Sequence, residues 1–236
     1  MHSLYLFCGL LCDEASWGDV PERLADIADV HIVSFPGLSS IGAMAAAFLA
    51  IAPAEFAVAG HSMGGRVALE TWKRDPRRIA GIALLNSGVN PPRDAEIHTR
   101  GRMVRLARER GMRALAAEWI PPLIGSSPER TAQLMPILTS MVERSTVESF
   151  AKQTAALLHR PDARPVLASI DVPTVLIGGT NDTWPSLAQH ADIQRSVPHA
   201  PLVEIAGAGH MTPIERPDAV ARALRAWLRQ RPRASR

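Results

Sequence analysis

The chain has 236 residues and a mass of 25.5 kDa, a size that fits one α/β or all-β domain. With 47% hydrophobic and 21% charged residues, it is neither a disordered chain nor a coiled coil. A formal charge of +3 and only 5% aromatic residues exclude a strongly basic nucleic-acid binder that stacks bases on its rings. Two cysteines, Cys8 and Cys12, are too few for a disulfide framework or a four-cysteine zinc site.

Two apolar stretches could be mistaken for targeting or membrane segments. Residues 4–12 have no basic flank before them and no cleavage pattern after them. Residues 41–53 fall far short of the roughly 20 residues that a membrane span needs. We therefore expect both to be core elements of a cytoplasmic protein that has no membrane partner.

Short apolar runs alternate with amphipathic helical stretches along most of the chain, which is typical of a parallel sheet covered by helices. The candidate strands are Ser3–Cys8, Val30–Phe35, Glu55–Gly60, Ile79–Asn86, Thr174–Gly178 and Pro201–Ile205. Ser40 is placed to cap a helix, and Pro217 marks the start of the last one. The sequence predicts an α/β fold with a mostly parallel sheet of six strands and helices on both faces.

This alternation stops between residues 90 and 165, where the pattern is entirely helical. Breaks fall at Pro121-Pro122 and at Ser126-Ser127-Pro128. We therefore expect a core of residues 1–89 and 166–236 that carries a helical cap. The cap holds 12 basic and 8 acidic residues, whereas the remainder holds 14 and 15, so the positive excess lies in the cap.

The most informative motif is Gly60-His61-Ser62-Met63-Gly64, which follows an apolar strand and opens a helix. That context is the one required for a G-x-S-x-G nucleophile elbow. A serine on so sharp a turn needs glycines two residues away on either side, and its hydroxyl lies at a helix N-terminus, which favours negative charge. The alternative is a serine in an ordinary glycine-rich turn, but the strand and helix around Ser62 favour a nucleophile.

A nucleophilic serine needs a histidine base and an acid that orients it, in the chain order Ser, acid, His. Only His210 lies in a loop just past a strand; the other downstream histidines, His98, His159, His190 and His199, fall in helices or in the turn beyond one. Asp182 follows the preceding strand at the same edge of the sheet. Asp182 could also simply cap the next helix, and the two roles are compatible.

An acyl-transfer site also needs donors for the oxyanion that forms on the carbonyl oxygen. We expect the backbone N–H groups of Met63, directly after the nucleophile, and of Leu10, in the loop after the first strand. Gly9 lets that loop approach a substrate closely. Cys8 is interpreted as a packed small hydrophobe rather than a second nucleophile.

These segments together resemble the α/β-hydrolase superfamily over nearly the whole chain. The matching segments are Gly60–Gly64 for the elbow, Gly179–Asp182 for the acid loop, Gly207–His210 with Ile214–Pro217 for the histidine loop, and Cys8–Asp13 for the oxyanion loop. Size and cap resemble small bacterial carboxylesterases such as pimeloyl-carrier-protein methyl esterases and enol-lactone hydrolases. Many relatives have His-Gly where this chain has Cys8-Gly9, and the family's first hairpin has no counterpart, which implies six strands rather than eight.

Each of several further residues has two possible roles. Arg66 could face a substrate carboxylate or be solvated on its helix. Trp119, Met141 and Phe150 could line an acyl pocket or hold the cap helices together. The cap arginines could receive an acidic acyl carrier or coenzyme A, or form a solvated face; they are Arg100, Arg102, Arg105, Arg108, Arg110 and Arg113.

From these residues we expect a serine hydrolase that cleaves small carboxylic esters through an acyl-serine, with no metal or organic cofactor. The same site could instead support C–C bond hydrolysis, thioester cleavage or elimination. A ligand receptor that keeps the pocket but has little turnover is a further alternative.

Overall fold

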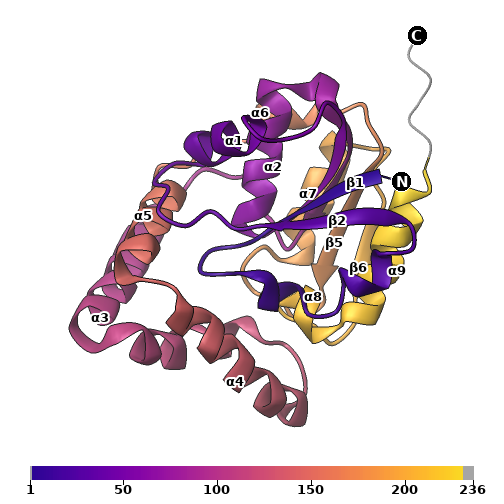
Figure 1. The fold of residues 1–236 in the computed structure, drawn as a ribbon. Coiled ribbons are helices and arrows are strands. Elements are labelled where there is room, and N and C mark those ends of the chain that lie inside the picture. The colour runs from indigo at the N-terminus through magenta and orange to yellow at the C-terminus, as the bar shows by residue number, and fades with distance from the viewer. Residues whose placement is uncertain (1, 231–236) are drawn as a thin grey trace.

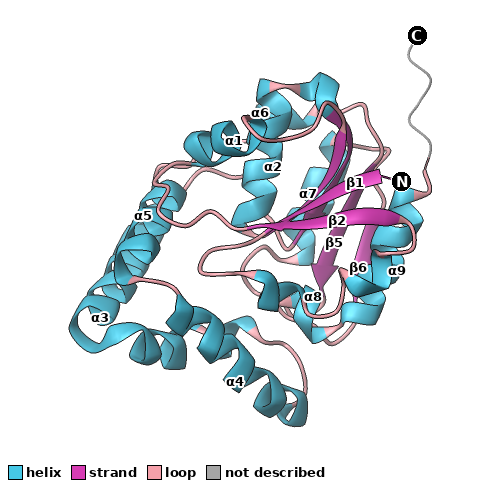
Figure 2. Ribbon diagram, in the orientation of Figure 1, coloured by secondary structure: helices cyan, strands magenta, loops and turns pink. Residues whose placement is uncertain are grey.

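The computed structural model describes residues 2–230; residue 1 and residues 231–236, which the expected core ranges include, lie outside the described residues. Its centre is a sheet of six parallel strands in the order β2-β1-β3-β4-β5-β6 (Figures 1 and 2). The strands are β1 (His2–Phe7), β2 (Ala28–Val33), β3 (Phe56–His61), β4 (Ile79–Leu85), β5 (Thr174–Gly179) and β6 (Leu202–Ile205). All six predicted strands are confirmed, with ends displaced by two residues at most.

Helices cover both faces of the sheet. Gly81 of β4 packs against Trp227 of α9 (Pro217–Leu228); a Cβ atom at this glycine would lie 3.0 Å from the indole ring. Gly60 of β3 lies against the start of α2 (Met63–Arg74) on the opposite face, because side chains alternate along a strand. The α2 face also carries α1 (Ile41–Leu49), which contacts α2, and α7 (Leu187–Ser196), which contacts β5.

The ends of two helices follow the local rules from which they were predicted. Ser40 accepts a hydrogen bond from the Ala43 N–H at 3.0 Å and so caps α1, satisfying one of the N–H groups that a helix start leaves free. Pro217 occupies the first position of α9, where its missing N–H has no consequence.

The segment between β4 and β5 contains helices and no strand within the described residues. Its elements are α3 (Asp94–Trp119), η4 (Pro121–Leu123), α4 (Pro128–Arg144), α5 (Val147–Leu158) and α6 (Arg164–Leu167). We call α3, α4 and α5 the cap helices; Figure 1 shows them together beside the carboxyl end of the sheet. Gly111 breaks α3 with a φ of 81°, a kink that the helical pattern alone did not predict.

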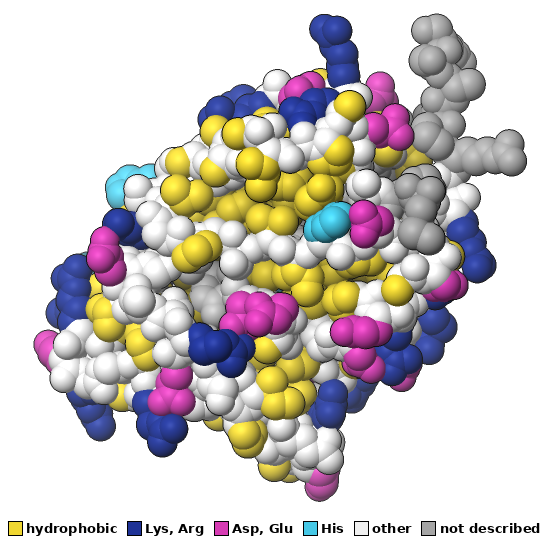
Figure 3. Space-filling model, viewed as in Figure 1, with side chains coloured by type: hydrophobic (Ala, Val, Ile, Leu, Met, Phe, Trp, Pro, Cys, Tyr) yellow, Lys and Arg dark blue, Asp and Glu magenta, His cyan; other side chains and the backbone are white. Residues whose placement is uncertain are grey.

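The outward face of α3 is basic. Figure 3 shows Lys and Arg side chains along the edge of the molecule where α3 lies. Arg102 and Arg113 pair with Glu118 and Glu143, whereas Arg105, Arg108 and Arg110 are exposed without an ion pair in the described chain. Within residues 2–230, no helix combines the length and the apolar character that crossing a membrane requires.

Candidate active site

Ser62 lies on a turn between β3 and α2 that only a glycine-rich sequence can form. Its φ of 54° is in the left-handed region, which L side chains rarely adopt. A Cβ atom at Gly60 would lie 2.5 Å from the Gly64 carbonyl oxygen, and one at Gly64 would collide with the Phe7 carbonyl. The backbone of Ser62 is held on both sides: its N–H donates to Leu85 O at 2.8 Å, and its carbonyl accepts from Ser87 Oγ at 2.9 Å. The serine is therefore fixed at the carboxyl end of the sheet.

His210 connects Ser62 to Asp182. The hydroxyl of Ser62 lies 2.8 Å from His210 Nε2, and His210 Nδ1 lies 2.9 Å from Asp182 Oδ2. A carboxylate only accepts hydrogen bonds, so Nδ1 carries the proton and Nε2 presents its lone pair to the hydroxyl. Residues from three separate loops at one edge of the sheet are thus joined in an unbroken hydrogen-bonded chain.

Asp182 is 6% exposed and accepts three hydrogen bonds. Besides His210, its donors are Asn86 Nδ2 at 2.7 Å and the Trp184 N–H at 2.9 Å. Burial alone would raise the pKa of this carboxyl, but the hydrogen bonds and charge of His210, with those from Asn86 and Trp184, outweigh it and leave the pKa below its usual value. Asp182 is therefore an anion facing the imidazole.

Asn86 is a site residue that sequence reasoning missed. It follows β4 directly, has a φ of 47°, and also donates to Gly209 O at 3.1 Å. One amide thereby holds both the acid and the loop that carries the histidine. An asparagine just past a buried strand, at a position that needs a positive φ, was the only available signal.

The histidine loop is fastened to the cap by backbone and carboxylate contacts. The His210 N–H donates to Leu123 O at 2.7 Å. Glu215, 2% exposed, accepts from the Gly209 N–H at 2.9 Å and from the Gly125 N–H and Ser126 Oγ at 2.8 Å each. The position of the imidazole thus depends on the segment between α3 and α4 as well as on the sheet.

His61 is buried beside the site and is uncharged at neutral pH. Its Nε2–H donates to the His210 carbonyl at 2.8 Å, while its Nδ1 has no partner in the described chain. Burial, and then the neighbouring charge of His210, lower the pKa of His61 to about 4. The residue therefore supports the histidine loop as a neutral ring.

The loop after β1 lies directly against Ser62. A Cβ atom at Gly9 would be 3.3 Å from Ser62 Cβ. Leu11 has a φ of 60°, and its N–H donates to Gln153 Oε1 at 3.0 Å, while Gln153 Nε2 donates to Phe35 O at 3.0 Å. The Leu10 N–H has no acceptor among residues 2–230. A cap residue, Gln153, therefore sets the shape of this loop.

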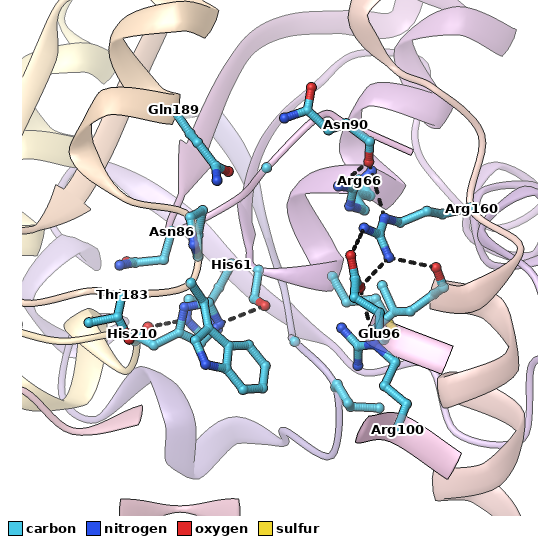
Figure 4. Close-up of a pocket in the computed structure, with 18 of the residues that line it drawn as sticks. His61, Arg66, Asn86, Asn90, Glu96, Arg100, Arg160, Thr183, Gln189 and His210 are labelled. Carbon is cyan, nitrogen blue, oxygen red and sulfur yellow. Dashed lines mark hydrogen bonds and ion pairs between the residues drawn. The ribbon is translucent and has the colours of Figure 1, made fainter. Parts of the chain in front are cut away.

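A cavity of about 390 Å³ opens between Ser62 and the cap helices (Figure 4). Of the residues predicted for the site, Leu10, Ser62, Met63, Arg66, Trp119 and His210 line it, and Asp182 lies behind His210. Met141 and Phe150 are buried and do not line it.

Both cysteines are free and buried. Burial raises the pKa of Cys8 to about 12 and that of Cys12 further, so both thiols stay protonated. Within residues 2–230, no three His, Cys, Asp or Glu side chains are grouped so that they could hold a metal ion.

Comparison with known proteins gives a consistent result. The model of the alpha/beta hydrolase family matches residues 5–223. A pimeloyl-[acyl-carrier protein] methyl ester esterase of Xanthomonas campestris is 28% identical over 96% of this chain and 94% of its own. A thermophilic esterase of Thermogutta terrifontis superposes with a TM-score of 0.86, 26% identity, and coverage of 97% and 90%. An enol-lactonase of Burkholderia xenovorans shares the fold, with a TM-score of 0.87, 23% identity, and coverage of 98% and 92%.

Proposed function

The chain belongs to the alpha/beta hydrolase family, and from that premise we propose that it is a serine hydrolase of small carboxylic esters. The observation that carries the proposal is the hydrogen-bonded chain from Ser62 through His210 to Asp182 at the floor of the cavity. Its esterase relatives support the same reaction class.

The proposed reaction proceeds in two steps, acylation of Ser62 and hydrolysis of the acyl-serine. Ser62 Oγ adds to the ester carbonyl carbon while its proton passes to His210 Nε2, and Asp182 stabilises the imidazolium. The resulting oxyanion is bound by the N–H groups of Leu10 and Met63, a contribution of about 3–4 kcal/mol for each donor. Collapse of this intermediate breaks the ester C–O bond, and the leaving alcohol takes the proton from His210. Water, deprotonated by His210, then hydrolyses the acyl-serine by the same route.

Labelling of Ser62 tests this proposal. A neutral fluorophosphonate should label the wild type at Ser62, and the wild type should hydrolyse p-nitrophenyl butyrate. In Ser62→Ala both should vanish, with turnover down by at least about 10⁴-fold. The matched control is Ser39→Ala, an exposed serine outside the cavity, which should label and turn over normally. Undiminished hydrolysis by Ser62→Ala would refute the mechanism, whereas labelling without turnover would indicate a receptor.

We further propose that the exposed arginines of α3 receive an acidic acyl carrier or coenzyme A that presents the ester. Support comes from the unpaired Arg105, Arg108 and Arg110 in the described chain, and from the relative named for an acyl-carrier protein ester. The double variant Arg105→Glu/Arg108→Glu should slow hydrolysis of a carrier-bound ester and leave a free ester unaffected. If the double variant and the wild type hydrolysed the carrier-bound ester at the same rate, these arginines would not bind such a partner.

A further inference from the structure

One side of the cavity is strongly basic. Apart from two histidines, the acidic and basic side chains that line the cavity are four arginines and a single glutamate: Arg66, Arg93, Arg100, Arg160 and Glu96. Figure 4 shows Arg66, Arg100 and Arg160 on the side of the pocket that faces away from Asn86, Thr183 and His210. The basic side therefore lies across the cavity from the hydrogen-bonded histidine.

Glu96 does not neutralise this side of the cavity, because it is already shared. Its two oxygens accept from Arg160 at 2.7 and 2.8 Å, and Arg100 approaches one of them at 3.4 Å. Burial opposes ionisation of Glu96, but the hydrogen bonds and charge of Arg160, followed by Arg100, lower its pKa to about 2. Arg160 is thus paired with Glu96, and a positive excess remains on Arg66 and Arg100.

Arg66 has a buried donor that is unused. Its Nη2 donates to Asn90 O at 2.9 Å, a carbonyl that Arg160 Nε also contacts at 3.2 Å. Its Nη1 is buried and has no hydrogen-bond partner among residues 2–230. A buried guanidinium that lacks an anion is costly, and a bound carboxylate would remove that cost. Carboxylates fit the planar guanidinium particularly well, since two parallel hydrogen bonds can form.

The amide of Gln189 faces the other terminal nitrogen of Arg66, Nη2, across Gly88. A Cβ atom at Gly88 would lie 3.6 Å from Arg66 Nη2 and 3.4 Å from Gln189 Oε1, so both groups approach one point. The amide of Gln189 makes no hydrogen bond within the described chain, and rotation about its last torsion can present Nε2 instead of Oε1. Gly88 leaves the space between them open, which a larger side chain would fill.

We infer that, among esters that no carrier presents, the preferred substrate is a half-ester of a short dicarboxylic acid, whose ester carbonyl lies at Ser62 and whose free carboxylate binds Arg66 with Gln189. This inference rests on the proposed ester hydrolysis and adds the acid end of the substrate to it. Arg66 follows Ser62 by four residues, in the first turn of α2, and both side chains line the same cavity of about 390 Å³. A cavity of that volume has room for a short acyl chain between them.

The test compares two esters of equal shape at neutral pH: monomethyl glutarate and methyl 5-methylhexanoate, in which an isopropyl group replaces the carboxylate. The wild type should prefer the half-ester in kcat/KM by about tenfold to a hundredfold, the range expected for hydrogen bonds between charged groups. In Arg66→Met this ratio should fall to near one. Arg66→Lys should restore part of it, because lysine carries the positive charge but cannot form two parallel hydrogen bonds with a carboxylate. Arg222→Met, an exposed arginine on α9 remote from the cavity, should keep the wild-type ratio.

A measurement on the wild type alone covers the case in which a variant fails to fold. Free glutarate should slow the labelling of Ser62 by a neutral fluorophosphonate, and 1,5-pentanediol should not. Equal kcat/KM for the two esters, or an unchanged ratio in Arg66→Met, would overturn the inference while labelling of Ser62 left the ester hydrolase intact. Absence of labelling together with no hydrolysis of either ester would instead overturn the proposed function.

Discussion

The two sides of the cavity are built by different means. On the sheet side, Ser62, His210 and Asp182 follow three strand ends, and backbone contacts fix each of them. On the cap side, Glu96 lies in α3 and Arg160 just after α5; they share two hydrogen bonds, and Arg160 also donates to three backbone carbonyls. The first side depends on the parallel sheet, and the second depends on the contacts that long side chains make.

The difference indicates a division of tasks. Parallel strands bring their carboxyl ends to one edge, so small groups placed there keep their geometry whatever the cap contains. The cap contributes the long charged side chains of Glu96 and of Arg160, just after α5, to the other side of the cavity. Changes on the sheet side should therefore act on turnover, and changes to this ion pair on stability.

The largest effect should come from the acid on the sheet side. Asp182→Asn keeps the shape but offers an amide donor to His210, which favours the tautomer whose Nε2 cannot accept the Ser62 proton. We expect kcat to fall by about 10⁴-fold with the free energy of unfolding little changed. Asp192→Asn, an exposed carboxylate on α7 paired with Arg195, is the control and should retain full activity. Near-normal turnover in Asp182→Asn would show that Asp182 does not orient the base.

On the cap side, Glu96→Gln should lower stability instead. The change leaves the guanidinium of Arg160, only 7% exposed, without a charged partner, and we expect the free energy of unfolding to fall by about 3 kcal/mol. Urea denaturation measures this. The exposed Glu148–Lys152 pair supplies the control, because solvent screens this pair and Glu148→Gln should leave the free energy of unfolding almost unchanged. If both variants lost the same small amount, the cap side would not depend on this ion pair.

The same division explains what could be read from the sequence. The six strands and the positions of Ser62, Asp182 and His210 could be predicted, because each follows an apolar run at a strand end. The basic side could not, since whether Arg66 points into the cavity or into solvent depends on Asn90 and on a residue 94 positions away, Arg160.

Other features escaped prediction because they depend on distant contacts. Asn86 holds Asp182 across 96 positions, and Gln153 holds the loop at Leu11 across 142. The residues next to Asn86 or Gln153 in the sequence do not predict such a distant partner. The kink at Gly111 escaped for the opposite reason, since the residues around it keep a helical pattern that conceals one non-helical position.

Asn86→Gly should separate positioning from chemistry on the sheet side. Glycine accepts the positive φ of this position, so the variant removes only the hydrogen bonds to Asp182 and Gly209. A hydrogen bond to a charged group is worth about 1.5–3 kcal/mol, and we expect kcat to fall tenfold to a hundredfold with KM largely retained. Steady-state kinetics on one neutral ester measure both. A change in KM alone would place Asn86 in substrate binding rather than in support of the acid.

The smallest effect concerns pH and the buried ring of His61, which lies where the sheet side meets the histidine loop. Its pKa is about 4 in the folded protein against an ordinary 6.5, so between these values the unfolded chain binds a proton that the folded protein does not bind. The free energy of unfolding, as far as it depends on His61, therefore keeps its full value above pH 6.5 and decreases as the pH falls towards 4; the loss due to His61 is about 2 kcal/mol at pH 5. Urea denaturation at several pH values should show a shallower decline for His61→Gln than for the wild type, whereas His98→Gln, exposed on α3, should follow the wild type. Parallel declines in all three proteins would mean that carboxylates alone set the acid sensitivity, and that His61 is not held neutral by the fold.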